Sequence, residues 1–210
     1  MGKSKIIAEI GQNHCGNMQL AKILIGLARL YGADLVKFQL YDHKKLYGNN
    51  GGIPNVELSY EQAKELFEYG KMLDIEVFFS VFDTEHIRWC EEIGVKRYKI
   101  PYKWRGNKEL VEAVRATNKP VMVSSYKPEF GDTLYCISEY PASIEDIDWS
   151  QMEACNGFSD HTIGIGAVKE AIRRGSKVIE KHFAINHETG VDAEWSMDPK
   201  ELKDLVRFAR

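Results

Sequence analysis

Residues 5–40 read KIIAEIGQNHCGNMQLAKILIGLARLYGADLVKFQL, and this stretch has the pattern of a strand, a helix and a second strand. The apolar runs at 5–10 and 35–40 lack the alternation of a strand with one wet face, which is typical of parallel strands covered on both sides. Between them, apolar residues such as Leu20 and Leu24 recur at helical spacing. The stretch therefore predicts one unit of a parallel α/β fold.

The same alternation continues to the end of the chain. We expect strands at Lys5–Ile10, Leu35–Leu40, Glu76–Val81, Arg97–Pro101, Pro120–Ser125, Thr133–Ser138, Gly157–Ser159 and Lys177–Phe183. Between them, the spacing predicts helices over 20–28, 59–73, 84–93, 107–117, 163–174 and 198–210. Ser59 followed by Gln62 has the form of a capping box, which marks a helix start. The segment 41–55 is predicted as a loop, either a lid or an inert insertion.

This strand count distinguishes two architectures, a closed barrel and an open doubly wound sheet. Eight strands favour a compact (β/α)₈ TIM barrel, and Gly11–Gly16 lacks the GxGxxG turn that a dinucleotide-binding sheet would need. The segments that follow the fifth and sixth strands are too short for full helices, and Pro128 and Gly131 interrupt the first of them. We therefore predict one barrel domain over 1–210, with the helices after strands five and six missing or shortened.

The composition excludes several classes of protein. Of 210 residues, 44% are hydrophobic and 28% are charged, with a formal net charge of −3, so a disordered tail and a collagen-like repeat are excluded. Without a basic excess, nucleic acid is not an expected partner. No stretch is long and apolar enough for a signal peptide or a membrane helix. The four cysteines form no CxxC pair, which predicts reduced thiols and a cytoplasmic protein.

Polar residues at the carboxyl ends of the strands are the site candidates, because active sites of barrel enzymes form on that face. Lys37 and Lys99 lie within apolar strand sequences, where an unpaired charge is costly. If both point into the barrel mouth, they form an anion site for phosphate or carboxylate. The alternative is that each lysine pairs with a nearby carboxylate such as Glu9.

Two histidines end neighbouring strands. His161 follows the seventh strand and His182 ends the eighth, so two imidazoles at matching heights can hold one divalent cation and leave positions open. The alternative is that both are packing residues. Of the other histidines, His14 could reach the site, whereas His43 and His86 read as loop or helix-surface residues.

Six motifs together resemble the sialic acid synthase family, which condenses phosphoenolpyruvate with an N-acetylated amino sugar. They span nearly the whole chain, in order: Ile6-Ile7-Ala8-Glu9-Ile10-Gly11 with Asn13-His14, Gly32-Ala33-Asp34-Leu35-Val36-Lys37-Phe38-Gln39, Tyr98-Lys99-Ile100, Ser138-Glu139-Tyr140-Pro141, Phe158-Ser159-Asp160-His161-Thr162-Ile163-Gly164 and Val178-Ile179-Glu180-Lys181-His182-Phe183. Asp192 and Ser196-Met197-Asp198-Pro199 fit the last loop and helix of the family.

The resemblance implies a (β/α)₈ barrel and roles for individual residues. By resemblance, His161 and His182 would bind Mn²⁺ or Mg²⁺, and Lys37 and Lys99 would hold phosphoenolpyruvate. Glu9 and Gln39 would lie close to the reacting carbons. The expected substrate-binding residues are Ser80, Ser138, Tyr140, Ser159 and Asp192.

Departures from the family pattern concern the second substrate. After Tyr-Lys-Ile the family usually carries a small residue, then Ser and a later Glu, where this chain has Pro101, Tyr102 and Trp104. The family's C-terminal antifreeze-like domain has no counterpart in the sequence. Two alternatives therefore stand beside the synthase: a non-catalytic barrel that binds metal and anion, and a related synthase or aldolase with a different aldehyde. Faces left open by the missing helices would favour a homodimer.

Overall fold

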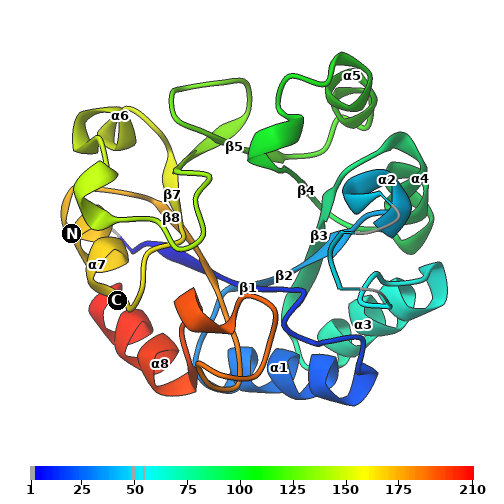
Figure 1. Cartoon of the computed structure of the whole chain (residues 1–210), viewed down its shortest axis with the longest axis horizontal. Helices are drawn as coiled ribbons and strands as arrows, with labels where there is room; N and C mark the ends of the chain where they lie inside the picture. Colours follow the sequence, from blue (N-terminus) through cyan, green and yellow to red (C-terminus); the bar gives the residue numbers. More distant parts are fainter. Residues whose placement is uncertain (1–2, 49–50, 54) are drawn as a thin grey trace.

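The fold is a closed barrel of parallel strands that pair in sequence order, with β8 returning to β1 (Figure 1). The computed structural model describes residues 3–48, 51–53 and 55–210. The strands are β1 (Lys5–Gly11), β2 (Leu35–Leu40), β3 (Glu76–Val81), β4 (Tyr98–Ile100), β5 (Val121–Ser125), β6 (Asp132–Cys136), β7 (Gly157–Asp160) and β8 (Val178–His182). The predicted barrel is confirmed, and every predicted strand is present.

Six helices of eight or more residues in the described part of the chain surround the barrel. They are α1 (Met18–Leu30), α3 (Tyr60–Met72), α4 (Thr84–Ile93), α5 (Lys108–Ala116), α7 (Gly166–Arg173) and α8 (Pro199–Phe208). The capping box of Ser59 and Gln62 is confirmed, and Asp198 with Glu201 forms a second one at α8. None of the helices in the described part of the chain is long and apolar enough to cross a bilayer.

The helices after β5 and β6 are missing or shortened, as predicted. All of residues 126–131 are described and none is helical, while β6 and β7 are joined by the turn η2 (Ile144–Asp146) and the five-residue α6 (Trp149–Glu153). The outer sides of β5 and β6 are nevertheless covered, because Val123 and Tyr135 are buried. The Tyr135 hydroxyl accepts a hydrogen bond from the backbone N–H of Asp148, which caps α6. The open faces expected to favour a homodimer are therefore not found at these residues.

The barrel interior has two layers, because alternate residues of each strand point inward. Near the amino ends of the strands an apolar plug fills the barrel, formed by Ile7, Leu35, Phe78, Met122, Leu134 and Val178. Two residues further along the strands the inward positions are polar: Glu9, Lys37, Ser80, Lys99, Ser124, Cys136, Ser159 and Glu180. The plug closes the barrel below, so the polar layer is reached from the carboxyl ends of the strands.

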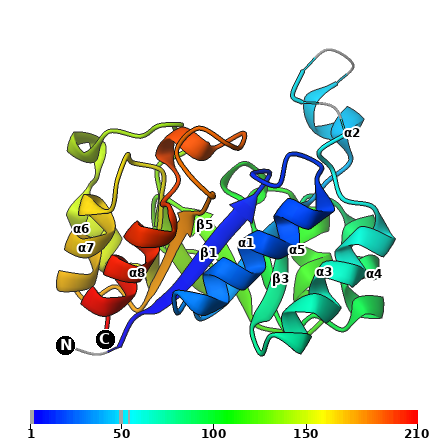
Figure 2. The same cartoon turned by 90° about the horizontal axis from the view of Figure 1, so that it is seen from below.

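One helix was not predicted. α2 (His43–Tyr47) begins after Asp42, whose carboxylate caps it, and projects beyond the carboxyl ends of the strands (Figure 2). It lies within the segment 41–55 that was expected to be a loop; residues 49, 50 and 54 of that segment lie outside the described residues. α2 therefore places Tyr47 above the mouth of the barrel.

Candidate active site

Lys37 and Lys99 point into the barrel and share one carboxylate, that of Glu180 on β8. Lys99 Nζ donates to Glu180 Oε1 at 2.8 Å, and Lys37 Nζ lies 3.2 Å from Glu180 Oε2. Lys37 Nζ also lies 3.2 Å from Glu9 Oε2 and donates to Ser80 Oγ at 2.8 Å. The lysines thus converge in the barrel mouth, as expected, and each has a carboxylate partner, as the alternative expected; the anion site itself stays a prediction.

The two carboxylates of this cluster are electrostatically different. Burial raises the pKa of Glu9, and the charge of Lys37 does not overcome this effect. Burial acts in the same direction on Glu180, but there Lys37 and Lys99 together outweigh it and lower the pKa. Glu180 is therefore the carboxylate that stays ionised, and Glu9 is the one that takes up a proton more readily.

The two lysines differ in a similar way. Burial opposes the charge of Lys37, but Glu180 and Glu9 outweigh it and raise the pKa of this lysine. The pKa of Lys99 is lowered, because burial dominates and Lys37 adds repulsion that Glu180 does not cancel. Lys37 is therefore the lysine whose positive charge its neighbours support better.

Serine and glutamine side chains hold the carboxylates in place. Ser159 Oγ donates to Glu180 Oε1 at 2.9 Å, and Gln39 Nε2 donates to Glu9 Oε1 at 3.1 Å. We call the enclosed space the inner chamber, a cavity of about 50 Å³ lined chiefly by Glu9, Lys37, Ser80, Lys99, Ser124, Cys136, Ser159, His161, Glu180 and His182. Most of the predicted catalytic and metal-binding residues thus line one small, charged space.

His161 and His182 lie side by side at the wall of this chamber, with ring centroids 5.5 Å apart. His161 Nδ1 donates to the carbonyl of Ile137 at 2.8 Å, and His182 Nδ1 lies 3.2 Å from Asp192 Oδ2. Burial lowers the pKa of His161 to about 3, whereas Asp192 outweighs burial and raises the pKa of His182. Nδ1 of His161 is held by a carbonyl and Nδ1 of His182 faces a carboxylate, so Nε2 of each ring is the nitrogen left for a ligand, an arrangement found in metal-binding histidines. The pair fits a divalent cation.

Asn13 fixes the loop that carries Asp192. Its amide nitrogen donates to the carbonyl of Phe183 at 3.1 Å and to Ser196 Oγ at 2.9 Å, and its amide oxygen accepts the backbone N–H of Asp192 at 2.8 Å. Gly190 passes so close that a Cβ there would lie 2.4 Å from Asn13 Oδ1. The buried side chain of Asn13 therefore positions Asp192 behind His182.

A second, wider space opens above the inner chamber. This outer chamber is a cavity of about 310 Å³ lined by Gln12, Gln39, Leu46, Tyr47, Phe82, Pro101, Tyr102, Lys103, Trp104, Ser138, Tyr140, His182, Val191, Asp192 and Trp195. Gln39, Tyr140 and His182 line both chambers, so the two are continuous. The predicted substrate-binding residues Ser138 and Asp192 lie in the outer chamber.

Three residues differ from their sequence-based interpretation. Glu180 was quoted in a motif but given no role. It lies two residues before His182 on β8, and this spacing places both side chains on the same face of the strand. His14 does not reach either chamber: its ring lies 5.9 Å from that of Phe38, and burial lowers its pKa to about 4. His86 is buried rather than on the surface, with Nδ1 2.7 Å from Asp83 Oδ1.

Comparison with known proteins identifies the family. The family model described as NeuB matches residues 24–132 and 132–210, and the break coincides with the first residue of β6, after the connection without a helix. An N,N′-diacetyllegionaminic acid synthase of Legionella pneumophila is 33% identical over 252 aligned positions, covering 98% of this chain and 71% of the relative. A synthase of the same name from Campylobacter jejuni is 31% identical, covering 100% of this chain and 76% of the relative.

A solved structure agrees with the sequence relatives. The crystal structure of the N-acetylneuraminic acid synthetase of Leptospira borgpetersenii superposes with a TM-score of 0.92 at 28% identity, covering 99% of this chain and 83% of that one. The chain therefore belongs to the NeuB family and is an enzyme of the sialic acid synthase type.

Proposed function

We propose that this enzyme condenses phosphoenolpyruvate with an N-acetylated amino sugar, an N-acetylmannosamine-like aldose, to give a sialic acid-type nonulosonate and phosphate. One observation carries the proposal: Lys37 and Lys99, buried on β2 and β4, lie in the same small chamber as His161 and His182. Fixed ammonium groups suit a small polyanion, and the continuous outer chamber has room for a sugar.

The lysines bind phosphoenolpyruvate through its phosphate and carboxylate. An ammonium group has three donors, and Lys99 gives one to Glu180, which leaves others for the substrate. Ser80 and Ser159 add hydroxyl groups at the same level of the barrel. Glu180 stays ionised between the lysines and holds both in place through its two carboxylate oxygens. A protein charge fixed before the substrate arrives needs little reorganisation during the reaction.

The reaction forms a carbon–carbon bond and then releases phosphate. C3 of phosphoenolpyruvate attacks the aldehyde carbon, the aldehyde oxygen takes up a proton, and positive charge develops at C2. Water adds at C2 and gives up one proton, which balances the proton taken up by the aldehyde oxygen. The bond between C2 and the phosphate oxygen then breaks with its electron pair leaving on phosphate, the new C2 hydroxyl becomes the carbonyl, and its proton leaves with phosphate. One aldose, one phosphoenolpyruvate and one water thus give one nonulosonate and one phosphate.

Glu9 is the group best suited to move the proton. Burial raises its pKa, so it can both hold and release a proton during turnover. The amide of Gln39 orients its carboxylate from the side of the outer chamber, where the aldose enters. Lys37, beside Glu9, stabilises its ionised form after the proton has left.

His161 and His182 would hold Mn²⁺ or Mg²⁺, with Asp192 behind His182. Imidazole nitrogen is a softer donor than the oxygen ligands that Mg²⁺ prefers, which favours Mn²⁺ of the two. A cation bound there supplies a Lewis acid for the aldehyde oxygen. Asp192 would hold Nδ1 of His182 and leave Nε2 as the nitrogen for the cation.

Phosphate release from phosphoenolpyruvate tests the proposal, with a panel of N-acetylhexosamines and with Mn²⁺ present or chelated. The expected result is release that depends on both the aldose and the cation. Folded protein that releases no phosphate with any aldose would overturn it. Tight binding of phosphoenolpyruvate without turnover would favour the non-catalytic alternative, and the mass of the product identifies a different aldehyde substrate.

A further inference from the structure

A third cavity lies between α2 and the first turns of α3 and α4, and none of its residues lines the inner or the outer chamber. We call it the side cavity. It has a volume of about 550 Å³, and its lining includes Tyr41, His43, Glu57, Glu85, His86 and Trp89. We infer that the side cavity binds a small organic cation, an ammonium group joined to an apolar ring.

Three buried polar atoms of the side cavity make no hydrogen bond: Tyr41 Oη, His43 Nδ1 and Glu57 Oε2. The other described residues with a buried side-chain atom in that condition all line the inner or the outer chamber; they are Glu9, Glu180, His182 and Trp195. A buried polar group without a partner is costly, so native structures keep few of them. The feature that accompanies the two chambers therefore also marks the side cavity as a binding site.

His43 and Glu57 present two acceptors to one donor group. His43 Nδ1 and Glu57 Oε2 lie 4.0 Å apart, which is too far for a hydrogen bond between them. With its proton on Nε2, the imidazole accepts at Nδ1, as the carboxylate does at Oε2. One ammonium nitrogen at about 2.8 Å from each atom fits between acceptors at this separation. Tyr41, whose side chain is buried, adds a hydroxyl in the same wall.

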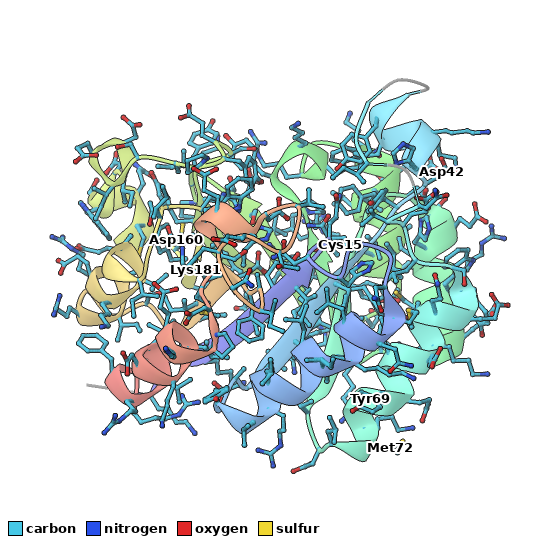
Figure 3. All side chains as sticks on the ribbon, turned by 60° about the horizontal axis from the view of Figure 1, so that its bottom comes forward. Cys15, Asp42, Tyr69, Met72, Asp160 and Lys181 are labelled. Atoms are coloured by element: carbon cyan, nitrogen blue, oxygen red, sulfur yellow. The ribbon has the colours of Figure 1, made fainter. Side chains whose placement is uncertain are left out.

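The charges of the lining favour a cation over an anion. Its acidic residues are Asp42, Glu57 and Glu85, and its lysine is Lys44, which is exposed to solvent. Two of these carboxylates are engaged: Asp42, labelled in Figure 3, caps α2, and Glu85 Oε2 lies 3.7 Å from Lys45 Nζ. Glu57 has no lysine or arginine partner among the described residues, so an ammonium ligand would supply the missing charge.

A bare metal ion fits the side cavity less well than an organic cation. Stable metal sites usually have three or more protein ligands. Among the residues that the structure describes, no third histidine, cysteine or carboxylate ligand atom lies within 4.8 Å of both His43 Nδ1 and Glu57 Oε2. The volume of about 550 Å³ is instead in the range of sites for small organic molecules.

Trp89 supplies the surface for the apolar part of the ligand. It lies on α4, half-buried, with its ring centroid 4.6 Å from that of His86 at an angle of 72°. His86 is fixed in turn, because its Nδ1 lies 2.7 Å from Asp83 Oδ1. An indole attracts cations to its face and packs against apolar rings, so Trp89 suits a ligand that has both.

Benzylamine, which is protonated at neutral pH, is the probe, and neutral benzyl alcohol is its control of similar shape. Two-dimensional NMR of the indole N–H groups reports where the probe binds, because the chain has four tryptophans in different places. Trp89 lines the side cavity, Trp104 and Trp195 line the outer chamber, and Trp149 lies on α6. Each signal is assigned by replacing one tryptophan at a time with phenylalanine.

Benzylamine is expected to shift the Trp89 signal with a dissociation constant of about 1 mM and to leave that of Trp149 in place. Benzyl alcohol should bind about tenfold more weakly or less. Glu57→Gln should weaken the binding of benzylamine by about tenfold or more, and His43→Phe, which keeps a ring but loses the acceptor, should weaken it as well. Unmoved signals of the other tryptophans show that each variant is folded.

Asp192→Asn is the matched control, because it removes the negative charge of a carboxylate that lines the outer chamber. It should leave the affinity for benzylamine unchanged. Shifts of Trp104 and Trp195 that are lost in Asp192→Asn would place the cation in the outer chamber and overturn the inference. An unmoved Trp89 signal, or equal binding of the two probes, would also overturn it. Because no substrate is present, the result does not depend on whether the proposed function is correct.

Discussion

The inner and outer chambers are built in different ways. The side chains of the inner chamber lie on strands, and the barrel register places Glu9 opposite both Lys37 and His182. Those of the outer chamber come mainly from α2, from the turns η1 (Tyr102–Trp104) and η3 (Ala193–Trp195) and from the loops after the strands, while Gln39 and His182 are strand residues that line both chambers. Rigid strands suit the reactant shared by a family, whereas loops and turns can change without disturbing the barrel. The difference indicates where chemistry is fixed and where specificity varies.

Two consecutive residues of β8 show that burial of a charge alone does not mark a catalytic group. Glu180 lines the inner chamber. Lys181, the next residue, points to the other face of the strand, and its Nζ lies 2.7 Å from Oδ2 of Asp160; Figure 3 labels this pair. Lys181 also donates to the carbonyl of Thr162 at 2.7 Å, so both hydrogen-bond partners of its ammonium group lie outside the inner chamber. The four predictions that follow separate these roles.

The largest effect is expected from Lys99→Met, which removes a positive charge from the inner chamber. Without it, phosphoenolpyruvate loses one of its two fixed cations, so kcat/KM should fall by about 1,000-fold. Phosphate release measures the change, and circular dichroism confirms that the variant is folded. Activity within tenfold of the wild type would mean that Lys99 does not hold the substrate.

Lys181→Met should instead lower stability and leave the chemistry intact. The substitution leaves the buried carboxylate of Asp160 without its positively charged partner, so the free energy of unfolding should fall by about 3 kcal/mol. Urea denaturation measures this loss, and kcat per folded molecule should remain that of the wild type. A large fall in kcat with unchanged stability would erase the distinction between the two faces of β8.

Asp192→Asn tests the join between the chambers. Asparagine at this position has no negative charge to place beside Nδ1 of His182. The affinity for Mn²⁺ should therefore fall by about 10–100-fold. Electron paramagnetic resonance of free Mn²⁺ measures the affinity, with the exposed neighbour variant Glu194→Gln as the control. Equal affinities in the two variants would argue against a cation at His161 and His182.

The smallest effect concerns His14, which lies outside both chambers. The pKa of His14 is about 4 in the folded protein, against the ordinary value of 6.5 that applies to the unfolded chain. The unfolded chain therefore takes up a proton first, and the free energy of unfolding falls as the pH falls from 6.5 toward 4. By pH 5 the loss should be about 2 kcal/mol. Denaturation of His14→Gln and wild type at pH 7 and pH 5 measures the difference; identical losses would contradict this assignment.

Much of the inner chamber could be predicted from the sequence, because a strand has a period of two and its charged residues are conspicuous among apolar neighbours. The same period assigns Glu180 inward and Lys181 outward, a signal that the motif alone did not use. The outer chamber could not be derived in this way: Tyr47, Phe82 and Trp195 meet only through tertiary packing of loops. Trp104 was noticed as a departure from the family pattern. The homodimer, the cation and the cytoplasmic location stay predictions.

A crystal of the enzyme soaked with Mn²⁺ and phosphoenolpyruvate tests the division of labour between the chambers most directly. The account predicts phosphate and carboxylate against Lys37 and Lys99 in the inner chamber, Mn²⁺ at the Nε2 atoms of His161 and His182, and an outer chamber left free for the aldose. Phosphoenolpyruvate bound in the outer chamber against Lys103, with the inner lysines still paired only to Glu9 and Glu180, would contradict it.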